Sequence, residues 1–333
     1  MTGRRAADPL PADPQTGRAV DVSVIVPAHN RPDYLPASVA SILEQRWSGT
    51  LEILCIDDGS EIDPFSRLPD PLPDNIRLFR KPNAGAGSAR RHGIERARGR
   101  YIAFNDDDDL WLPERLRLQF EFLEAHADID MIFGDLIEFD ARGEAPTTHF
   151  TGRVDVLEHA GERVGAGDPP IHRFARGSLI GPFMANIPLF HQAVLARRSL
   201  IERMGSLDPR LRAADCTDFA LRAAHHGVLA YLDMPTFRLR RGHVHETADD
   251  SWMDRDIGEF FEIYPDYPDA LRQEIQPWLG HFLANRGYLH FKHGRYRLAA
   301  EAYRDAARHG PIGARSRVKW GLAAGLGLFL RAG

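Results

Sequence analysis

The chain has 333 residues, 43% of them hydrophobic and 27% charged, so it can bury a sizeable core and is neither fibrous nor wholly disordered. Its formal net charge of −5 provides no global basic field, which excludes nucleic acid as a partner. The two cysteines, Cys55 and Cys216, are far apart and lack a CxxC spacing. We therefore expect neither a disulfide framework nor a cysteine-rich zinc site, and we expect a reducing, cytoplasmic compartment.

Residues 1–20 are rich in Pro, Asp, Gly and Arg and contain no apolar run, so we expect a disordered tail and no secretory signal. From residue 21, short apolar runs alternate with helical patterns. The expected strands are 22–26, 51–56, 76–79, 101–104 and 130–133, and the expected helices are 33–47, a segment that ends near 98, and 113–126. This alternation predicts an α/β fold, with a mostly parallel sheet flanked by helices.

The second half of the chain is less regular, with helices expected at about 192–204 and 215–226. Residues 256–333 have a helical pattern, in which Gly287, Gly294 and Tyr303 fall at the offsets of one tetratricopeptide-like hairpin. We expect this region to dock on the main domain or to serve a protein partner or self-association. The predicted organisation is a tail over 1–20, an α/β domain over 21–255 with halves 21–135 and 136–255, and a helical region over 256–333.

The longest uncharged apolar stretch is 320–330, which is shorter than the roughly 18–20 residues that span a bilayer. Basic residues flank it on both sides. It is expected either to pack as a helix on its neighbours or, as segment 315–331, to rest on the anionic inner face of a membrane.

Polar residues gather directly after three of the expected strands, at 27–31, 57–60 and 105–109. The carboxyl ends of parallel strands share one edge of the sheet, where ligands bind in such folds. The last cluster contains four consecutive aspartates, 106–109, which repel one another and raise each other's pKa values. Asp109 could instead cap the following helix, and others could simply be solvated. A divalent Mn²⁺ or Mg²⁺ would relieve the repulsion and neutralise a diphosphate leaving group.

Four segments in this half resemble the family-2 glycosyltransferases of GT-A fold: 24–30, 56–60, 83–90 and 101–109. They occur in that family's order and spacing and cover 22 to about 115, and weaker similarity continues to about 250. The resemblance implies a metal-dependent, inverting glycosyltransferase. Such an enzyme moves a sugar from a nucleotide-sugar donor to a glycan, a lipid-linked or another hydroxyl acceptor, as in polysaccharide biosynthesis.

The resemblance also assigns roles to individual residues. His29 would stack on the nucleotide base and Asp58 would accept a hydrogen bond from it. Arg90 would meet the base or the diphosphate, or it is an exposed helix charge. Asp106 and Asp108 are the two acids of the DxD motif and the expected metal ligands, with Asp108 the first choice. The donor-binding positions implied in this way are Pro27, Ala28, His29, Asn30, Asp58, Arg90, Asp106 and Asp107.

Inverting transfer needs a carboxylate to take the proton of the acceptor hydroxyl. The family places this base in an acidic pair at the start of a helix, which matches Asp215 and Cys216 here. Because the usual aspartate of the pair falls on Cys216, three alternatives follow: Asp215 is the base, Asp218 is the base, or activity is altered or lost. Asp215 could also be only a helix N-cap.

His243 and His245, in the basic cluster 238–245, are expected either as further metal ligands or as surface histidines. Two rival functions remain. A sugar nucleotidyltransferase would show glycines in the turn after the first strand, and 27–31 has none. A catalytically degenerate glycosyltransferase domain would bind a nucleotide, or a partner through its C-terminal helices, and Cys216 favours it.

Overall fold

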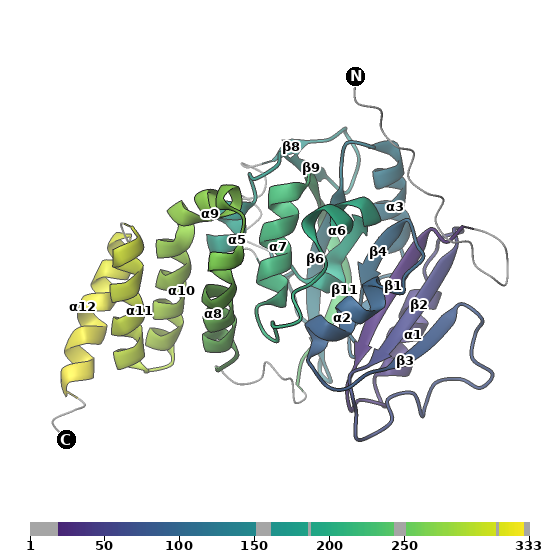
Figure 1. Ribbon diagram of the computed structural model, residues 1–333, viewed down its shortest axis with the longest axis horizontal. Helices are drawn as coiled ribbons and strands as arrows, with labels where there is room; N and C mark the ends of the chain where they lie inside the picture. Colours follow the sequence, from purple (N-terminus) through teal and green to yellow (C-terminus); the bar gives the residue numbers. More distant parts are fainter. Residues whose placement is uncertain (1–18, 151–160, 186–187, 243–250, 311–312, 330–333) are drawn as a thin grey trace.

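The computed structural model describes residues 19–150, 161–185, 188–242, 251–310 and 313–329. A single sheet runs through the main body with helices packed against it, and a row of helices follows at the C-terminal end (Figure 1). The predicted α/β class is confirmed. The expected N-terminal tail, up to residue 18, and the two candidate ligands His243 and His245 lie outside the described residues.

Four parallel strands form one side of the sheet, in the order β3-β2-β1-β4. They are β1 (Val22–Ala28), β2 (Leu51–Asp57), β3 (Ile76–Arg80) and β4 (Tyr101–Phe104). Every residue of β1 and β4 is buried, which explains why these runs are apolar without alternation: both faces of a parallel sheet are covered. All four were predicted.

The other side of the sheet is mixed. β10 (Val194–Arg197) lies antiparallel between β4 and β6 (Met131–Asp140), and β11 (Leu229–Arg240) is parallel to β6. The remaining strands are β5 (Leu110–Trp111), β7 (Gly143–Glu144), β8 (Glu162–Arg163) and β9 (Ile171–Phe174).

The helix expected over 192–204 was wrong. A 3₁₀ turn, His191–Ala193, leads into β10, and only Arg198–Met204 is helical, as α6. Val194, Leu195 and Ala196 are fully buried and bond to strands on both sides. Pairing in the sheet thus overrides the apolar spacing of this segment, because a short apolar run does not distinguish strand from helix.

The helices of the main body are α1 (Leu35–Leu43), α2 (Ala86–Ile94), α3 (Arg115–Ala125), α5 (Ile180–Ala185), α6 and α7 (Asp215–His226). α2 follows a turn at Gly85, whose φ of +91° favours glycine. It packs closely on β1, since a Cβ at Gly93 would lie 2.4 Å from Ile25 Cγ2. In Figure 1, α2, α6 and α7 lie over the same side of the sheet.

The C-terminal region is helical, as predicted, with α8 (Ser251–Ile263), α9 (Asp269–Ile275), α10 (Leu279–Lys292), α11 (Tyr296–His309) and α12 (Ala314–Phe329). Its first helices share the main core through Phe260, Leu271 and Leu279. α10 and α11 pack so tightly that a Cβ at Gly287 would lie 2.8 Å from the Tyr303 ring. Among the described residues no helix is long and apolar enough to cross a bilayer.

Candidate active site

The structure brings the three predicted polar clusters together at the carboxyl edge of the sheet. The backbone N–H of His29 donates to Asp107 Oδ2 at 3.1 Å, and that of Asn30 donates to Ser60 Oγ at 2.9 Å. Asn30 has a positive φ of 56°, a conformation that asparagine tolerates better than most residues. The turn of residues 27–31 therefore lies between the ends of β2 and β4.

Asp58 is buried and holds the Gly/Ala-rich turn. Its carboxylate accepts the backbone N–H groups of Ala84 (3.1 Å) and Gly85 (2.7 Å), and the Lys81 ammonium contacts it as well. The predicted contact of Asp58 with a nucleotide base stays a prediction. Its visible role is to fix the start of α2 against the end of β2.

The four aspartates of the acidic run have different surroundings. Asp107, Asp108 and Asp109 are buried, whereas the Asp106 side chain is 27% exposed. Arg31 Nη1 bridges Asp107 (3.2 Å) and Asp108 (2.5 Å). Gln192 Nε2 bridges Asp106 (2.6 Å) and Asp109 (2.9 Å), and the backbone N–H of Arg240 also donates to Asp109. Asp109 is therefore held at the end of β11 and does not cap α3.

Burial and mutual repulsion shift the acidity of this run. Desolvation, followed by the charge of Asp108, raises the pKa of Asp107 to about 8. Desolvation and the neighbouring charges of Asp108 and Asp106 also raise the pKa of Asp109 well above its ordinary value. Burial is the larger cause of both shifts, and the repulsion between the carboxylates, which adds to it, is the part that a further cation would relieve. The donors are all carboxylate oxygens, so the residues present fit a hard Mg²⁺ or Mn²⁺.

Arg90 is buried between the two halves of the domain, so the alternative of an exposed helix charge was wrong. Its Nη2 lies 2.6 Å from Asp106 Oδ1, and its Nη1 lies 2.5 Å from Asp215 Oδ2. Both carboxylates raise the pKa of Arg90 against the opposing effect of burial, so it remains charged. Gly87 permits this approach, since a Cβ there would lie 3.1 Å from Asp215 Cβ.

The two candidate bases lie in different environments. Asp215 is the first residue of α7 and meets Arg90, and the N-cap position is Ala214, so the N-cap alternative was wrong. Burial raises the pKa of Asp215 to about 6, while Arg90 opposes that rise.

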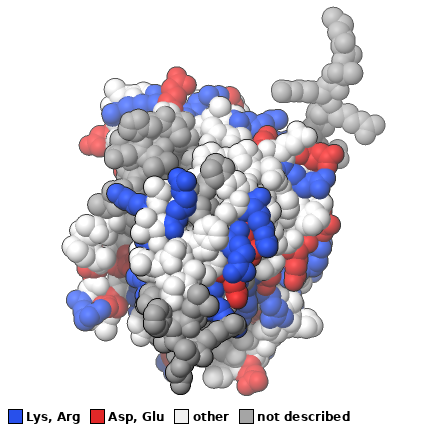
Figure 2. Space-filling view, turned by 90° about the vertical axis from the view of Figure 1, so that its left-hand side faces the viewer, with Lys and Arg blue, Asp and Glu red and all other residues white. Residues whose placement is uncertain are grey.

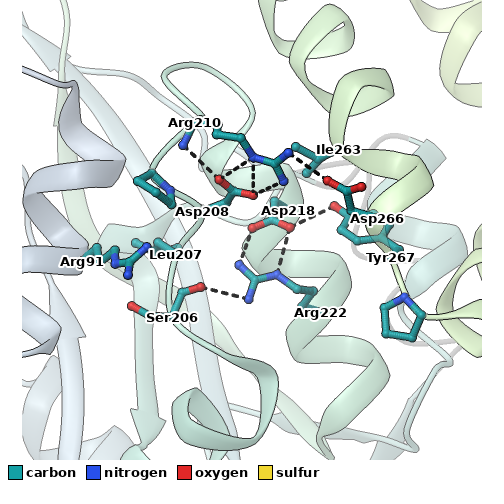
Figure 3. Close-up of a pocket in the computed structure, with 12 residues that line it drawn as sticks. Arg91, Ser206, Leu207, Asp208, Arg210, Asp218, Arg222, Ile263, Asp266 and Tyr267 are labelled. Atoms are coloured by element: carbon teal, nitrogen blue, oxygen red, sulfur yellow. Dashed lines mark hydrogen bonds and ion pairs between the residues drawn. The ribbon is translucent and has the colours of Figure 1, made fainter.

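Asp218 does not reach the acidic run. It is paired with the guanidinium of Arg222 and accepts a hydrogen bond from the Tyr267 hydroxyl at 2.9 Å. Figure 3 shows this pair in the wall of a separate cavity of about 450 Å³ between α7 and the segment after α8. The remaining charged side chains that line the cavity include Asp208, Arg210 and Asp266, which pair with one another.

Sequence reasoning missed several residues that the fold brings to this site. Gln192 was placed at the start of an expected helix and His191 just before it, and no local pattern marked either as a site residue. Arg31 was within a highlighted turn but had no assigned role. Arg240 ends β11, and its Nε donates to the Asp108 carbonyl at 2.9 Å. The end of β11 therefore lies beside the acidic run.

Comparison with known proteins adds an independent line of evidence. Residues 23–169 match the family described as Glycosyl transferase family 2. An uncharacterized glycosyltransferase of Rickettsia bellii is 40% identical over 108 residues, covering 32% of this chain and 16% of that protein. The putative teichuronic acid biosynthesis glycosyltransferase TuaG of Bacillus subtilis is 35% identical over 107 residues, covering 31% and 41%.

A third relative, the UDP-Glc:alpha-D-GlcNAc-diphosphoundecaprenol beta-1,3-glucosyltransferase WfgD of Escherichia coli, is 32% identical over 115 residues, covering 34% of this chain and 45% of that protein. The chain thus matches less than half the length of each of these relatives. Among solved structures, S. aureus TarS 1–349 in complex with UDP-GlcNAc has a TM-score of 0.53 at 16% identity, covering 86% of this chain and 90% of that chain. This likeness shows the fold, which is the expected GT-A arrangement.

Proposed function

Since residues 23–169 belong to glycosyl transferase family 2, we propose that this chain transfers a sugar from a nucleotide-sugar donor to a hydroxyl acceptor with inversion at the anomeric carbon. The donor occupies the carboxyl edge of the sheet, formed by 27–31, 57–60 and 105–109. One observation carries this proposal: Arg90 joins Asp106 of the donor side to Asp215 of the acceptor side within a single ion-pair network.

Asp215 is the catalytic base of this proposal. Its raised pKa of about 6 leaves it ionised near neutral pH yet basic enough to accept a proton, which suits general base catalysis. Arg90 holds the Asp215 carboxylate in place and keeps it ionised. Asp218 is occupied by Arg222 and Tyr267, which supports a structural role. Cys216, at the position where the family usually has an aspartate, is a poor base for a hydroxyl.

Asp106 and Asp108 would hold a divalent Mn²⁺ or Mg²⁺, which neutralises the charge that develops on a leaving diphosphate. Side chains of the protein supply further positive charge and the contact with the base. Arg31 and Arg90 supply fixed positive charge on either side of the acidic run. His29, whose Nε2 lies 3.1 Å from Asn83 Nδ2, would stack on the nucleotide base.

The names of two relatives, which refer to teichuronic acid and to a diphosphoundecaprenol-linked sugar, support a choice of acceptor classes. We therefore include growing glycans and lipid-linked sugars as acceptor classes, and UDP-sugars as the first donors to test. The C-terminal helix α12 supports a lipid-linked acceptor, because its exposed side chains combine Arg315 and Arg317 with the apolar Val318 and Leu322.

Figure 2 views the molecule from the end where α12 lies, and Lys and Arg side chains there border uncharged surface. A helix with this composition binds anionic lipid headgroups through its cations and the acyl boundary through its apolar residues. We propose that α12 brings the enzyme to an anionic membrane surface. The same helices offer the alternative of a protein partner or self-association.

The decisive experiment measures turnover of a panel of nucleotide sugars by the purified full chain with Mn²⁺, for wild type and Asp215→Asn. Loss of the general base lowers kcat by about 10²–10⁴-fold. Thermal shifts with each nucleotide sugar test donor binding separately, because a bound ligand stabilises the fold by mass action. Unchanged turnover in Asp215→Asn would overturn the assigned base. Donor binding without turnover in the wild type would favour the degenerate-domain alternative.

A further inference from the structure

Three side chains with different ligating atoms meet beside the proposed base. His191 Nδ1 lies 2.9 Å from Cys216 Sγ and 3.9 Å from Asp215 Oδ2, and the three ligand atoms all lie within 4.8 Å of one another. His191 comes from the 3₁₀ turn before β10, and the other two form the start of α7. Neither segment alone shows this cluster, because it is assembled by the packing of α7 on the sheet.

We propose that His191, Asp215 and Cys216 form a binding site for a zinc-type divalent cation, separate from the acidic run. Nitrogen, sulfur and oxygen together are the donor set of zinc, whereas Mg²⁺ and Mn²⁺ favour oxygen alone. Tetrahedral bonds of about 2.0 Å to nitrogen and about 2.3 Å to sulfur place neighbouring ligand atoms roughly 3.3–3.6 Å apart. The separations of His191 Nδ1 from Cys216 Sγ, 2.9 Å, and from Asp215 Oδ2, 3.9 Å, therefore need to change by less than about 1 Å.

Binding of the cation needs a neutral imidazole and a thiolate. Burial, together with the charges of Arg90 and Arg222, lowers the pKa of His191 well below its usual value, so the ring is neutral and offers a lone pair. Burial raises the pKa of Cys216, so it starts as a thiol. On binding, the S–H bond breaks, a sulfur–metal bond forms, and the proton leaves to solvent.

The charges around the cluster favour the cation. A divalent cation brings two positive charges, and the Asp215 carboxylate and the Cys216 thiolate bring two negative charges. Arg90 contacts the same Asp215 carboxylate and helps to fix its position. Neutrality at a buried site limits the desolvation cost that an unbalanced charge would cause. Of the three residues, Cys216 is the one that is partly exposed.

Occupation of this site has a consequence for the proposed function and rests on it. A cation bound to Asp215 takes the lone pair that would accept the proton of the acceptor hydroxyl. Zinc therefore inhibits transfer even when Mn²⁺ saturates the acidic run. The binding itself does not depend on the transferase activity.

The test measures Zn²⁺ binding to the full chain by competition with a chromogenic chelator, and Co²⁺ binding by absorption. A thiolate–cobalt bond gives a charge-transfer band in the near ultraviolet. Cys216→Ser is expected to remove this band and to weaken Zn²⁺ binding by at least about 10-fold. Mutation of a residue that only hydrogen-bonds to a metal ligand already lowers metal affinity by about that factor. His191→Ala is expected to weaken binding similarly.

Two controls make the result specific. Cys55→Ala removes the other cysteine of the chain, which is buried on β2, and should leave the cobalt band unchanged. Asp108→Asn alters the acidic run and should leave Zn²⁺ affinity unchanged. Wild-type affinity in Cys216→Ser, or a cobalt spectrum without a thiolate band, would overturn the site. Specific binding in a protein without any transferase activity would leave the site standing and refute the proposed function alone.

Discussion

Arg90 on α2 and Asp215 on α7 are 125 residues apart in the sequence, yet Nη1 of the arginine lies 2.5 Å from Oδ2 of the aspartate. The same guanidinium contacts Asp106, so one buried cation organises a carboxylate on each side of the site. A buried charge without its partner is strongly destabilising, which makes the pair sensitive to substitution. It also makes the pair a good place to test the proposals.

Arg90→Gln is expected to lower the free energy of unfolding by about 3–5 kcal/mol, because two carboxylates lose their buried partner. The matched control is Arg91→Gln on the same helix, whose exposed guanidinium pairs with Glu95 and should matter by less than about 1 kcal/mol. Urea unfolding of both variants measures the difference. Equal stabilities would contradict the central role of Arg90.

Asp218→Asn is expected to reduce stability and to leave catalysis largely intact. The substitution removes the buried ion pair with Arg222 and weakens the hydrogen bond from Tyr267. Breaking such a pair costs about 3–5 kcal/mol. Thermal unfolding and kcat, corrected for the folded fraction, separate the two effects. A stable but inactive Asp218→Asn protein would transfer the role of base from Asp215 to Asp218.

The pH dependence of kcat/KM should reveal Asp215. A general base is active when ionised, so activity is present above its pKa and is lost as pH falls through about 6, the value to which burial raises Asp215. Arg90 acts in the opposite direction by favouring the ionised form. Arg90→Gln should therefore move the acidic limb to higher pH. A limb near pH 4 in the wild type would show that an ordinary carboxylate controls the rate.

Two glycines in helices test how closely α2 packs on the sheet. Gly93→Ala is expected to destabilise by about 1–3 kcal/mol through overpacking, since its Cβ would lie 2.4 Å from Ile25 Cγ2. Gly258→Ala on α8 is the control, because a Cβ there meets no atom of the described structure within 4 Å. That change should stabilise by roughly 0.5–1 kcal/mol. Denaturant midpoints measure both, and a stable Gly93→Ala would refute the close packing.

Membrane contact through α12 can be measured by co-sedimentation with liposomes. Vesicles that contain anionic lipid should retain the wild type, and the double variant Arg315→Glu, Arg317→Glu should bind much less, because each cation near the surface contributes about 1 kcal/mol. The double variant Arg297→Glu, Arg308→Glu on α11 changes the net charge by the same amount at two exposed positions and is the control. Equal binding of all three proteins, or retention by neutral vesicles alone, would remove α12 from the membrane-binding role.

The sequence alone predicted the parallel half of the sheet and its ligand edge. The strands at 22–26, 51–56 and 101–104 are mostly apolar runs, and the polar turns 27–31, 57–60 and 105–109 follow these three runs directly. Such runs can be recognised in the sequence because a parallel strand is buried on both faces of the sheet and therefore consists mainly of apolar residues. The resemblance of these segments to a family then supported the expected function.

Only the tertiary structure decided which side chains meet. Gln192 and His191 reach the site because Val194–Arg197 joins the sheet as β10, a pairing that the local apolar spacing did not reveal. Arg90, Asp215 and Cys216 come together because the start of α7 lies against α2. Contacts between residues far apart in sequence depend on the packing of whole elements, and that packing is what selected Asp215 over Asp218 as the proposed base.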